Sequence, residues 1–490
     1  MQKKLLLIIG SGLSGLSAGT YAQKAGYNSI VFDKHFHPGG CVSFWKRKDF
    51  LIDGGIFMLM GCKPELRSYQ VFKDLGVGDS NLYIPMKEFG TFIDEMTGEK
   101  FTIGSDLNTL EKNLKKIAPE DTAIIEEIVR VIKDIKGKDT ASIGMSLPPE
   151  LNKGINKLKM LWEARPMIKH MNKRYLQSME KFTENVKSES LKSLLNGIFG
   201  PKAPTLFVLK LVAIMASGHM SFIKNGCQTF ISKITDNYKS LGGEIRCKQR
   251  VTKILVDDNK ALGVQLANGT TVKGDYVVSA SDSENTIYNL LEGKYTSPDI
   301  EYIHKQWKPE ESYMLATYGI NQDLNNEHTI NMLNLKQPIN YGDKQITSFL
   351  FRIMNYGDFA PKGKSVIQAR FNINWDYWNK LDKDKESYLK EKKRFANEVL
   401  ERLNSHYPGI KEKVEMTDVS TPCTIQRFTL NKYGSASGWG TTPECLAKKR
   451  NRTLPGLKNF YMAGQWAFAG GVLPTIYSGK HVIDLINHNY

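Results

Sequence analysis

A glycine-rich turn close to the start of the chain constrains the fold more than any other feature of the sequence. It reads Gly-Ser-Gly-Leu-Ser-Gly at residues 10–15, between an apolar run at residues 5–9 and a helix-like segment at residues 16–25. A second apolar segment at residues 29–32 ends on Asp33. The order of strand, glycine turn, helix, strand and acidic residue predicts a βαβ unit of the Rossmann type.

The three glycines of this turn have separate mechanical roles in such a unit. Gly10 allows the tight turn, Gly12 lets the backbone approach a pyrophosphate, and Gly15 lets the helix pack closely on the strand. The free N–H groups at the start of the helix attract phosphate, and an acidic side chain at the end of the second strand is placed to bind ribose hydroxyls. We therefore expect a dinucleotide to contact Gly10, Ser11, Gly12, Leu13, Ser14, Gly15, Asp33 and Lys34. The alternative is a glycine-rich turn in a βαβ unit that holds no ligand.

The composition narrows the class of protein only slightly. With 490 residues the chain is long enough for two or three structural units around a large core. The net charge of +16 is compatible with nucleic acid, anionic lipid or an acidic substrate as a partner. The basic residues are spread along the chain and no DNA- or RNA-binding module is present, so we expect no nucleic acid partner.

The densest basic stretch, residues 152–181, also carries many apolar side chains. This mixture is typical of a helix at the interface of an anionic membrane, and equally of a surface helix that packs inward. The longest strongly apolar region, residues 206–217, contains Lys210 and is too short to span a bilayer. The N-terminal apolar run is too short for a signal peptide and leads directly into the glycine turn.

The cysteines and histidines predict no metal site. No Cys-x-x-Cys pair occurs, and no histidine cluster has the spacing of metal ligands. The cysteines are typical of free thiols in a reducing compartment. We therefore expect a cytoplasmic enzyme, and peripheral attachment to the inner face of the membrane stays open. The six cysteines are Cys41, Cys62, Cys227, Cys247, Cys423 and Cys445.

The hydrophobic patterns divide the chain into two discontinuous units. The α/β patterns predict one nucleotide-binding domain assembled from residues 1–65, 220–282 and 415–490. The intervening residues 66–219 and 283–414 predict a second, α+β domain. The main elements expected beyond the glycine turn are a hairpin at 89–103, helices over 110–211 with an amphipathic run at 124–135, a helix at 226–241, strands at 250–256, 261–266 and 276–280 with an Asn268-Gly269 turn, strands at 313–320, 348–355 and 365–374, and helices at 383–403 and 475–486.

Five places in the chain together resemble the flavin-dependent amine oxidase and phytoene desaturase superfamily. The resemblance is strongest to the branch of phytoene desaturases, carotenoid isomerases and retinol saturases, and it is weak in the two insertions. The five places are residues 10–15 with Asp33; Pro38-Gly39-Gly40 with Asp53-x-Gly55; Gly242-Gly243-Glu244-Ile245 with residues 250–254; Thr421-Pro422 with Phe428, Thr429, Asn431, Gly434, Ser435 and Gly438-Trp439; and Ala463-Gly464-Gln465 with residues 471–474.

The resemblance implies FAD as the dinucleotide, held by a Rossmann-like FAD-binding domain beside an α+β substrate domain. A plain NAD dehydrogenase has no need of the last two places, and one glycine turn cannot supply backbone contacts to both ends of FAD. In this family the backbone at Val251 meets the adenine, and the C-terminal segment covers the ribityl chain and pyrophosphate. The further cofactor residues implied are Gly40, Cys41, Val251, Gly464, Gln465, Gly471 and Val472.

Two positions depart from the family pattern. Cys41 stands where many relatives have arginine, and Gln465 stands where many have aspartate. Glutamine can still donate a hydrogen bond to a phosphate or ribityl oxygen, whereas the cysteine removes a cation from the phosphate site. Cys41 is then either a packed bystander or a reactive thiol beside the flavin.

Few residues are candidates for the chemistry itself. No Ser-His-Asp set and no convincing pair of carboxylates occurs in the sequence. By its family position Asp53 is the acidic candidate nearest the flavin, and its alternative role is to hold the Gly54-Gly55 turn. Four aromatic residues are candidate flavin- or substrate-facing walls, with plain core packing as the alternative: Phe428, Trp439, Trp466 and Phe468.

The leading hypothesis is an FAD-dependent oxidoreductase that acts on carbon–carbon bonds of a lipophilic polyene or isoprenoid. Desaturation, isomerisation and saturation stay open, and so does the electron partner. The apolar residues 206–215 line a long tunnel under this hypothesis, or else form ordinary helical core. A flavin-dependent amine oxidase with a short aromatic cage is the second hypothesis, and a non-catalytic flavin- or lipid-binding protein is the third. A long apolar tunnel that opens beside residues 152–181 would favour the first.

Overall fold

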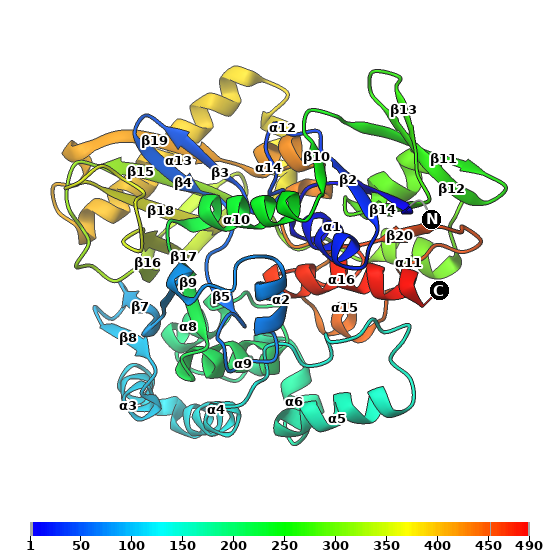
Figure 1. Cartoon of the computed structure of the whole chain (residues 1–490). Helices are drawn as coiled ribbons and strands as arrows, with labels where there is room; N and C mark the ends of the chain where they lie inside the picture. Colours follow the sequence, from blue (N-terminus) through cyan, green and yellow to red (C-terminus); the bar gives the residue numbers. More distant parts are fainter. Residues whose placement is uncertain (1–2, 451, 489–490) are drawn as a thin grey trace.

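The glycine-rich turn follows the central strand of a five-stranded parallel sheet in a computed structural model that describes residues 3–450 and 452–488. The strand order is β10-β2-β1-β14-β20, so distant parts of the chain meet in one sheet (Figure 1). The predicted Rossmann-like α/β unit is confirmed. Its strands are β1 (Leu5–Ile9), β2 (Asn28–Phe32), β10 (Glu244–Arg246), β14 (Tyr276–Ser279) and β20 (Phe460–Met462).

Three helices pack tightly together beside this sheet. They are α1 (Leu13–Lys24), α10 (Gly226–Ser240) and α16 (Val472–Asn487). A Cβ atom on Gly19 of α1 would lie 2.7 Å from the ring of Tyr238 in α10, and one on Gly479 of α16 would lie 2.3 Å from the carbonyl oxygen of Ser14 in α1. The absence of side chains at these two glycines therefore sets how closely the helices approach.

A small antiparallel sheet packs against the parallel sheet through a shared apolar cluster. Its strands are β11 (Val251–Asp257), β12 (Lys260–Leu266) and β13 (Thr271–Lys273). Ile254 and Val264 from the small sheet are buried with Leu7 and Val277 from the parallel sheet. The predicted Asn-Gly hairpin between β12 and β13 is confirmed, with Gly269 at a positive φ of 85°.

A second, seven-stranded sheet runs in the order β19-β15-β18-β17-β16-β7-β8. Its neighbouring pairs are antiparallel except for β16 with β7. Phe395, Val399 and Leu403 of helix α13 (Lys385–His406) are buried against it. The strands are β7 (Glu88–Asp94), β8 (Lys100–Gly104), β15 (Tyr313–Ile320), β16 (Ile330–Tyr341), β17 (Lys344–Ile353), β18 (Ser365–Asn372) and β19 (Val414–Ser420).

Two features of this sheet differ from the sequence prediction. Strand β16 was not expected, because Asn334 and Pro338 interrupt its apolar pattern and the pairing register shifts between Asn334 and Ile339. The predicted boundary at residue 415 falls inside β19, which pairs with β15 and so belongs with the seven-stranded sheet. The division into two units otherwise stays a prediction.

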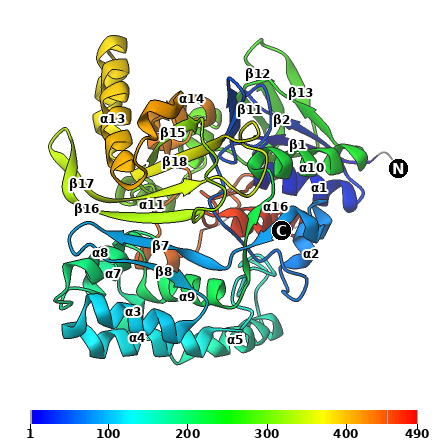
Figure 2. The ribbon, with the colours of Figure 1, turned by 90° about the vertical axis from the view of Figure 1, so that its left-hand side faces the viewer.

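Helices form a layer next to β7 and β8 (Figure 2). The principal ones are α3 (Leu107–Ile117), α4 (Thr122–Ile135), α8 (Glu189–Gly197) and α9 (Thr205–Ala216). Ile125, Ile128 and Ile132 of α4 are buried, so the predicted amphipathic helix is confirmed. The remaining elements are β3 (Phe44–Arg47), β4 (Phe50–Asp53), β5 (Leu59–Met60), β6 (Tyr83–Pro85), β9 (Met220–Ile223), α2 (Tyr69–Asp74), α5 (Ile155–Ile168), α6 (Lys173–Leu176), α7 (Met179–Phe182), α11 (Pro298–Gln306), α12 (Trp375–Leu381), α14 (Pro422–Thr429) and α15 (Pro443–Ala447).

Helix α5 lies within the basic stretch and contains no buried residue. Ile155, Leu158 and Trp162 are exposed by 79%, 66% and 68%. Met167 of the same helix packs against the core, so α5 is a surface helix that packs in part inward and leaves several apolar side chains exposed. No helix in the described residues is both long enough and apolar enough to cross a bilayer.

Candidate active site

One continuous cavity of about 1700 Å³ extends from the glycine turn to the seven-stranded sheet and helix α9. Typical small-molecule sites enclose roughly 300–1,000 Å³. The cavity therefore has room for a dinucleotide and for a second molecule beside it. Residues from both sheets and from the helical layer line its wall.

The N-terminus of α1 opens into one end of this cavity. Gly12 is the N-cap residue and no side chain caps the helix, so its first N–H groups are free to bind an anion. A Cβ atom on Gly15 would lie 1.9 Å from the carbonyl oxygen of Gly10, which shows why only glycine fits there. Gly39 donates its N–H to the carbonyl of Ser11, and this bond holds the Pro-Gly-Gly segment against the turn.

Asp33 fixes the geometry of the same end. Its carboxylate accepts hydrogen bonds from the backbone N–H and hydroxyl of Ser11 and from the backbone N–H of His35. Lys34 and Val251 line the cavity beside it. The ammonium of Lys34 donates to the carbonyl of Arg427, 2.7 Å away, which ties the end of β2 to α14.

A second free helix N-terminus faces the cavity from α16. Its N-cap, Gly471, has a φ of 99° and no side-chain cap, and Gly471 and Val472 both line the cavity. Gly464 also has a positive φ, and its N–H donates to the hydroxyl of Ser478. The cavity therefore has two uncapped helix N-termini, and each can bind an anionic or hydrogen-bond-accepting group of an extended dinucleotide such as its pyrophosphate.

Most of the predicted cofactor residues come together on this cavity. Ser11, Gly15 and Gly464 lie behind the wall and shape the turns that the others present. The predicted residues that line the cavity are Gly10, Gly12, Leu13, Ser14, Asp33, Lys34, Gly40, Cys41, Val251, Gln465, Gly471 and Val472.

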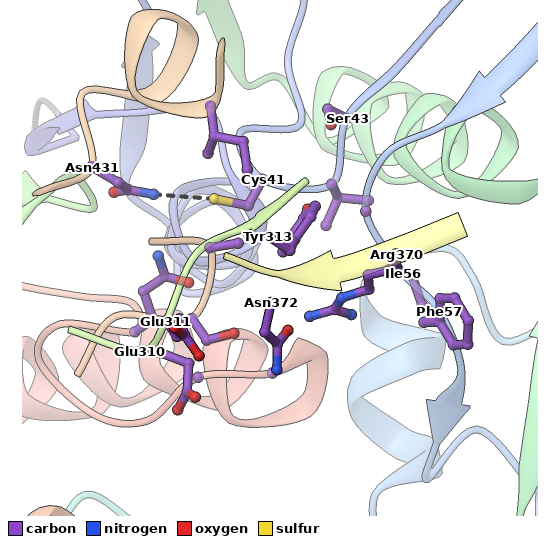
Figure 3. A pocket seen from close by; sticks show the side chains of 18 of the residues that line it. Cys41, Ser43, Ile56, Phe57, Glu310, Glu311, Tyr313, Arg370, Asn372 and Asn431 are labelled. Atoms are coloured by element: carbon purple, nitrogen blue, oxygen red, sulfur yellow. Dashed lines mark hydrogen bonds between the residues drawn. The ribbon is translucent and has the colours of Figure 1, made fainter. Parts of the chain in front are cut away.

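Cys41 lines the cavity as a neutral thiol. Its sulfur accepts a hydrogen bond from Nδ2 of Asn431, 3.1 Å away (Figure 3). Burial raises the pKa of the thiol to about 11, although hydrogen bonds from Gln465 and Asn431 oppose the shift. The thiolate is the nucleophilic form of cysteine, so the environment favours the packed role over the reactive one.

Asp53 lies behind the cavity wall, and the prediction that it acts beside the flavin is wrong. The residue is 2% exposed and its carboxylate accepts the N–H of Cys227. The guanidinium of Arg352 donates to the backbone carbonyls of Asp53 and Ile56. Burial raises the pKa of the Asp53 carboxyl, and the charge of Arg352 opposes that shift. These contacts hold the turn at Gly54 and Gly55, as the alternative hypothesis stated.

The four predicted aromatic residues have different positions. Trp439 and Trp466 line the cavity edge to face, with ring centroids 5.0 Å apart, and they also belong to a small buried cluster. Phe428 lines the cavity beside His35, close to Asp33, and its place at the flavin ring stays a prediction. Phe468 lies outside the lining and packs on His481, so its predicted role is wrong. Side-chain direction in these loops depends on tertiary packing that their sequence does not show.

A polar patch on β15 and β18 was missed by the sequence analysis. Tyr313 pairs with Asn372 across the two strands, and Arg370 lies two residues earlier, on the same face (Figure 3). The guanidinium of Arg370 lies 4.4 Å from the centre of the Tyr313 ring. The alternation of Gln368, Arg370 and Asn372 within an otherwise apolar strand is the signal that could have revealed a polar wall.

Many apolar side chains line the part of the cavity away from the glycine turn, with polar residues such as Lys192, Asn196 and Asn334 among them. The apolar residues come from helices α8 and α9 and from strands β5, β7, β16 and β17 or nearby loops, and they include Met58, Met60, Phe89, Ile198, Phe199, Phe207, Leu211, Met332 and Leu350. The predicted tunnel-lining role of residues 206–215 holds for Phe207, Lys210 and Leu211, and the other residues of that segment form core. No residue of 152–181 lines the cavity, so the lining gives no support from that stretch to the lipophilic-substrate hypothesis.

The sequence profile of the family described as "Flavin containing amine oxidoreductase" matches residues 13–486. The chain belongs to this family. The chain is therefore a flavin-dependent oxidoreductase with FAD as its cofactor, and the resemblance stated from the five sequence places is confirmed. That the two helix N-termini, the glycine turn and Asp33 hold the FAD stays a prediction, with which their position on one cavity agrees.

Similar proteins carry names from carotenoid and retinoid chemistry. A chloroplastic prolycopene isomerase from Daucus carota is 22% identical, over 96% of this chain and 78% of its own length. An all-trans-retinol 13,14-reductase from Danio rerio is 22% identical, over 98% of this chain and 86% of its own length. The solved structure of an oxidoreductase from Methanosarcina mazei, 16% identical, covers 98% of this chain and 100% of its own with a TM-score of 0.65, which supports the fold.

Proposed function

We propose that this FAD-dependent oxidoreductase desaturates, isomerises or saturates carbon–carbon bonds of a lipophilic polyene or isoprenoid. The observation that carries the proposal is the continuity of the cavity, which joins the FAD site to a long apolar lobe. The names of the carrot and zebrafish relatives support the same substrate class. A small amine substrate would fill little of the space that the cofactor leaves free in the cavity of about 1700 Å³.

FAD, when bound, exchanges a hydride with carbon, and the residues of this chain position the partners. The free N–H groups at the starts of α1 and α16 would bind phosphate and other acceptor groups of the cofactor. Trp439 and Trp466 form a rigid wall, and the apolar lobe excludes water from a bound polyene. Asn372 and Arg370 supply hydrogen-bond donors where the lobe meets the Gly55 turn, and the Tyr313 hydroxyl donates to the carbonyl of Gly54 in that turn.

Neither the acidic nor the nucleophilic candidate from the sequence offers strong acid–base catalysis at this site, whereas Glu310 and Glu311 line the cavity and burial raises the pKa of the Glu311 carboxyl. Asp53 lies behind the wall, and Cys41 is a neutral thiol. A hydride exchange or a geometric isomerisation of a conjugated system depends mainly on the placement of the reacting carbon against the cofactor.

The test is anaerobic incubation of the FAD-loaded protein with a panel of polyenes and, separately, a panel of amines. We expect a change in flavin absorbance or in polyene product mass or geometry, and no flavin reduction by amines. Flavin reduction by an amine with hydrogen peroxide release in air would favour the amine oxidase hypothesis. A bound flavin that dithionite cannot reduce, together with no polyene product, would favour the non-catalytic hypothesis.

We also propose that α5 contacts an anionic membrane surface at the cytoplasmic side. Its exposed Leu158 and Trp162 lie among Lys157, Lys159 and Lys169, so apolar insertion and charge attraction would act together. We expect the protein to float with phosphatidylglycerol vesicles but not with phosphatidylcholine vesicles. Trp162→Ser should weaken flotation severalfold, whereas Leu389→Ser, at an exposed position of α13, should not. Equal flotation of both variants would contradict the proposal.

A further inference from the structure

Lys210 is an unusual residue for its position in helix α9. The helix reads Thr-Leu-Phe-Val-Leu-Lys-Leu-Val-Ala-Ile-Met-Ala, and Lys210 is its one charged residue. The neighbouring residues Leu209 and Leu211 are buried, and α9 contacts α4, α6, α7 and β7. A lysine enclosed in such surroundings is costly unless its charge is compensated.

No protein group compensates this charge. Among residues 3–450 and 452–488, the Lys210 ammonium has no hydrogen bond and no ion pair, and its nearest recorded partner is the Phe207 ring, with a centroid 5.3 Å away. Burial alone lowers the pKa of the ammonium to about 8. Lys192, which lines the same cavity, has Glu189 at 2.8 Å.

The free ammonium faces the apolar lobe of the cavity. Lys210 lines the cavity together with Phe207, Leu211 and Phe199, whose ring packs edge-on against Phe207. Helix α9 lies well below α1 in both views (Figures 1 and 2), so this part of the lobe is remote from the glycine turn. A ligand that reaches it from the FAD site must be elongated.

Arg370 is a second cation on the cavity wall without a recorded ion pair, and it lies in a different region from Lys210. It lies over Tyr313, whose hydroxyl donates to the carbonyl of Gly54, next to the cofactor site. Burial lowers the pKa of the Arg370 guanidinium, and Tyr313 and the nearby carboxylate of Glu310 oppose that shift. Arg370 is therefore placed near the reacting part of a ligand, and Lys210 near its far end.

We propose that Lys210 binds a carboxylate at the end of an elongated polyene, so that the substrate class is an amphipathic polyene acid. This inference rests on the proposed function. One ammonium in an apolar lobe matches one negative charge, whereas a phosphate or diphosphate needs several donors. The Lys210 ammonium donates hydrogen bonds from Nζ to the ligand's carboxylate. From this carboxylate the apolar chain of the ligand runs through the lobe toward the FAD site.

The test measures binding of all-trans-retinoic acid, its methyl ester and all-trans-retinol to the FAD-loaded protein. We expect the wild type to bind the acid at least about tenfold more tightly than the ester, as one charge-assisted hydrogen bond supplies. Lys210→Met should abolish this preference and leave ester affinity unchanged, whereas Lys210→Arg should preserve it. Lys390→Met, on the exposed side of α13, is the matched control and should behave as the wild type.

The outcomes separate this inference from the proposed function. Preference for the acid that persists in Lys210→Met, or that is lost in Arg370→Gln instead, would overturn the assignment to Lys210. Binding and conversion of neutral polyenes without any preference for the acid would overturn the assignment of Lys210 as a carboxylate-binding residue, and the proposed function would stand. Absence of binding and conversion for every polyene would defeat the proposed function itself. Folding of each variant is checked by FAD retention and melting temperature, and Lys210→Arg keeps the test decisive if Lys210→Met does not fold.

Discussion

Burial decides the roles of individual residues in this molecule. Cys41 and Asp53 both have functional groups suited to catalysis, yet one is a neutral thiol and the other lies behind the wall. In contrast, Lys210 and Arg370 attract no notice in the sequence as site residues but face the cavity as charged groups. The chemistry available to each residue follows from its neighbours and its access to the cavity.

The state of Cys41 gives the first prediction. With a pKa of about 11, fewer than about one in a thousand of these thiols is ionised at pH 7.5, so we expect almost no modification by a thiol reagent in the native protein. Cys41→Ser should retain FAD with less than about a threefold change in affinity, because backbone groups supply the phosphate contacts. Mass spectrometry of labelled peptides and FAD titration check both points. Rapid labelling of Cys41 would contradict the account.

His481 gives a prediction about pH and stability. Its Nδ1 faces the guanidinium of Arg452, and burial and that charge lower the pKa of the imidazole well below its usual range. The unfolded histidine titrates near pH 6.5, so the stabilisation is present above that pH and is lost below it, at up to about 1.4 kcal/mol per pH unit. The urea midpoint should fall between pH 7 and pH 5. His481→Gln should flatten this fall, and His488→Gln, at the exposed end of α16, should leave it unchanged.

At the scale of elements, glycines inside helices set the shape of the FAD site. The close approach of α16 to α1 depends on Gly479, which lies against the carbonyl oxygen of Ser14. Both helices present their free N-termini to the same cavity. A small increase in the distance between the two helices would therefore move apart the N-termini of α1 and α16, which we expect to bind the cofactor.

Gly479→Ala should weaken FAD binding at least about tenfold and lower the melting temperature, because a Cβ atom there would lie 2.3 Å from the Ser14 oxygen. Gly104→Ala is the matched control, because nothing lies within 4 Å of its Cβ position and its φ is not positive. FAD fluorescence after desalting and a thermal melt measure the two effects. A Gly479→Ala protein that holds FAD as well as the control would contradict this view of the helix pair.

Local patterns revealed the elements whose stability is local. The glycine turn, the Asn-Gly hairpin and helix α4 are each indicated by a pattern in one short stretch of sequence. The structure contains all three as predicted. Strand β16 was missed because its polar residues and Pro338 are unusual in a strand, and its pairing with the distant strands β7 and β17 stabilises it. Likewise, only the pairing of distant strands places Tyr313 opposite Asn372, so the polar wall of the site had no local signal strong enough to reveal it.

At the scale of the whole molecule, one cavity connects the two sheets and the helical layer. The parallel sheet presents the cofactor contacts, and the seven-stranded sheet with α8 and α9 provides the wall opposite. Family membership accounts for the first part of this arrangement. The size and lining of the second part depend on residues 66–219 and 283–414, where the resemblance was weakest, and they decide which molecule is transformed.

The most direct test of the central claim blocks the lobe and leaves the cofactor site intact. Leu350 of β17 lines the lobe and pairs with Arg370 across the sheet, so Leu350→Trp should fill the space of a polyene. Leu389→Trp, at an exposed position on α13, is the control. The measurement is product mass and geometry after anaerobic incubation of each FAD-loaded protein with polyenes. We expect conversion by the wild type and the control, and at least about tenfold less by Leu350→Trp with FAD retained. Equal conversion by Leu350→Trp would contradict the claim that the substrate occupies this cavity.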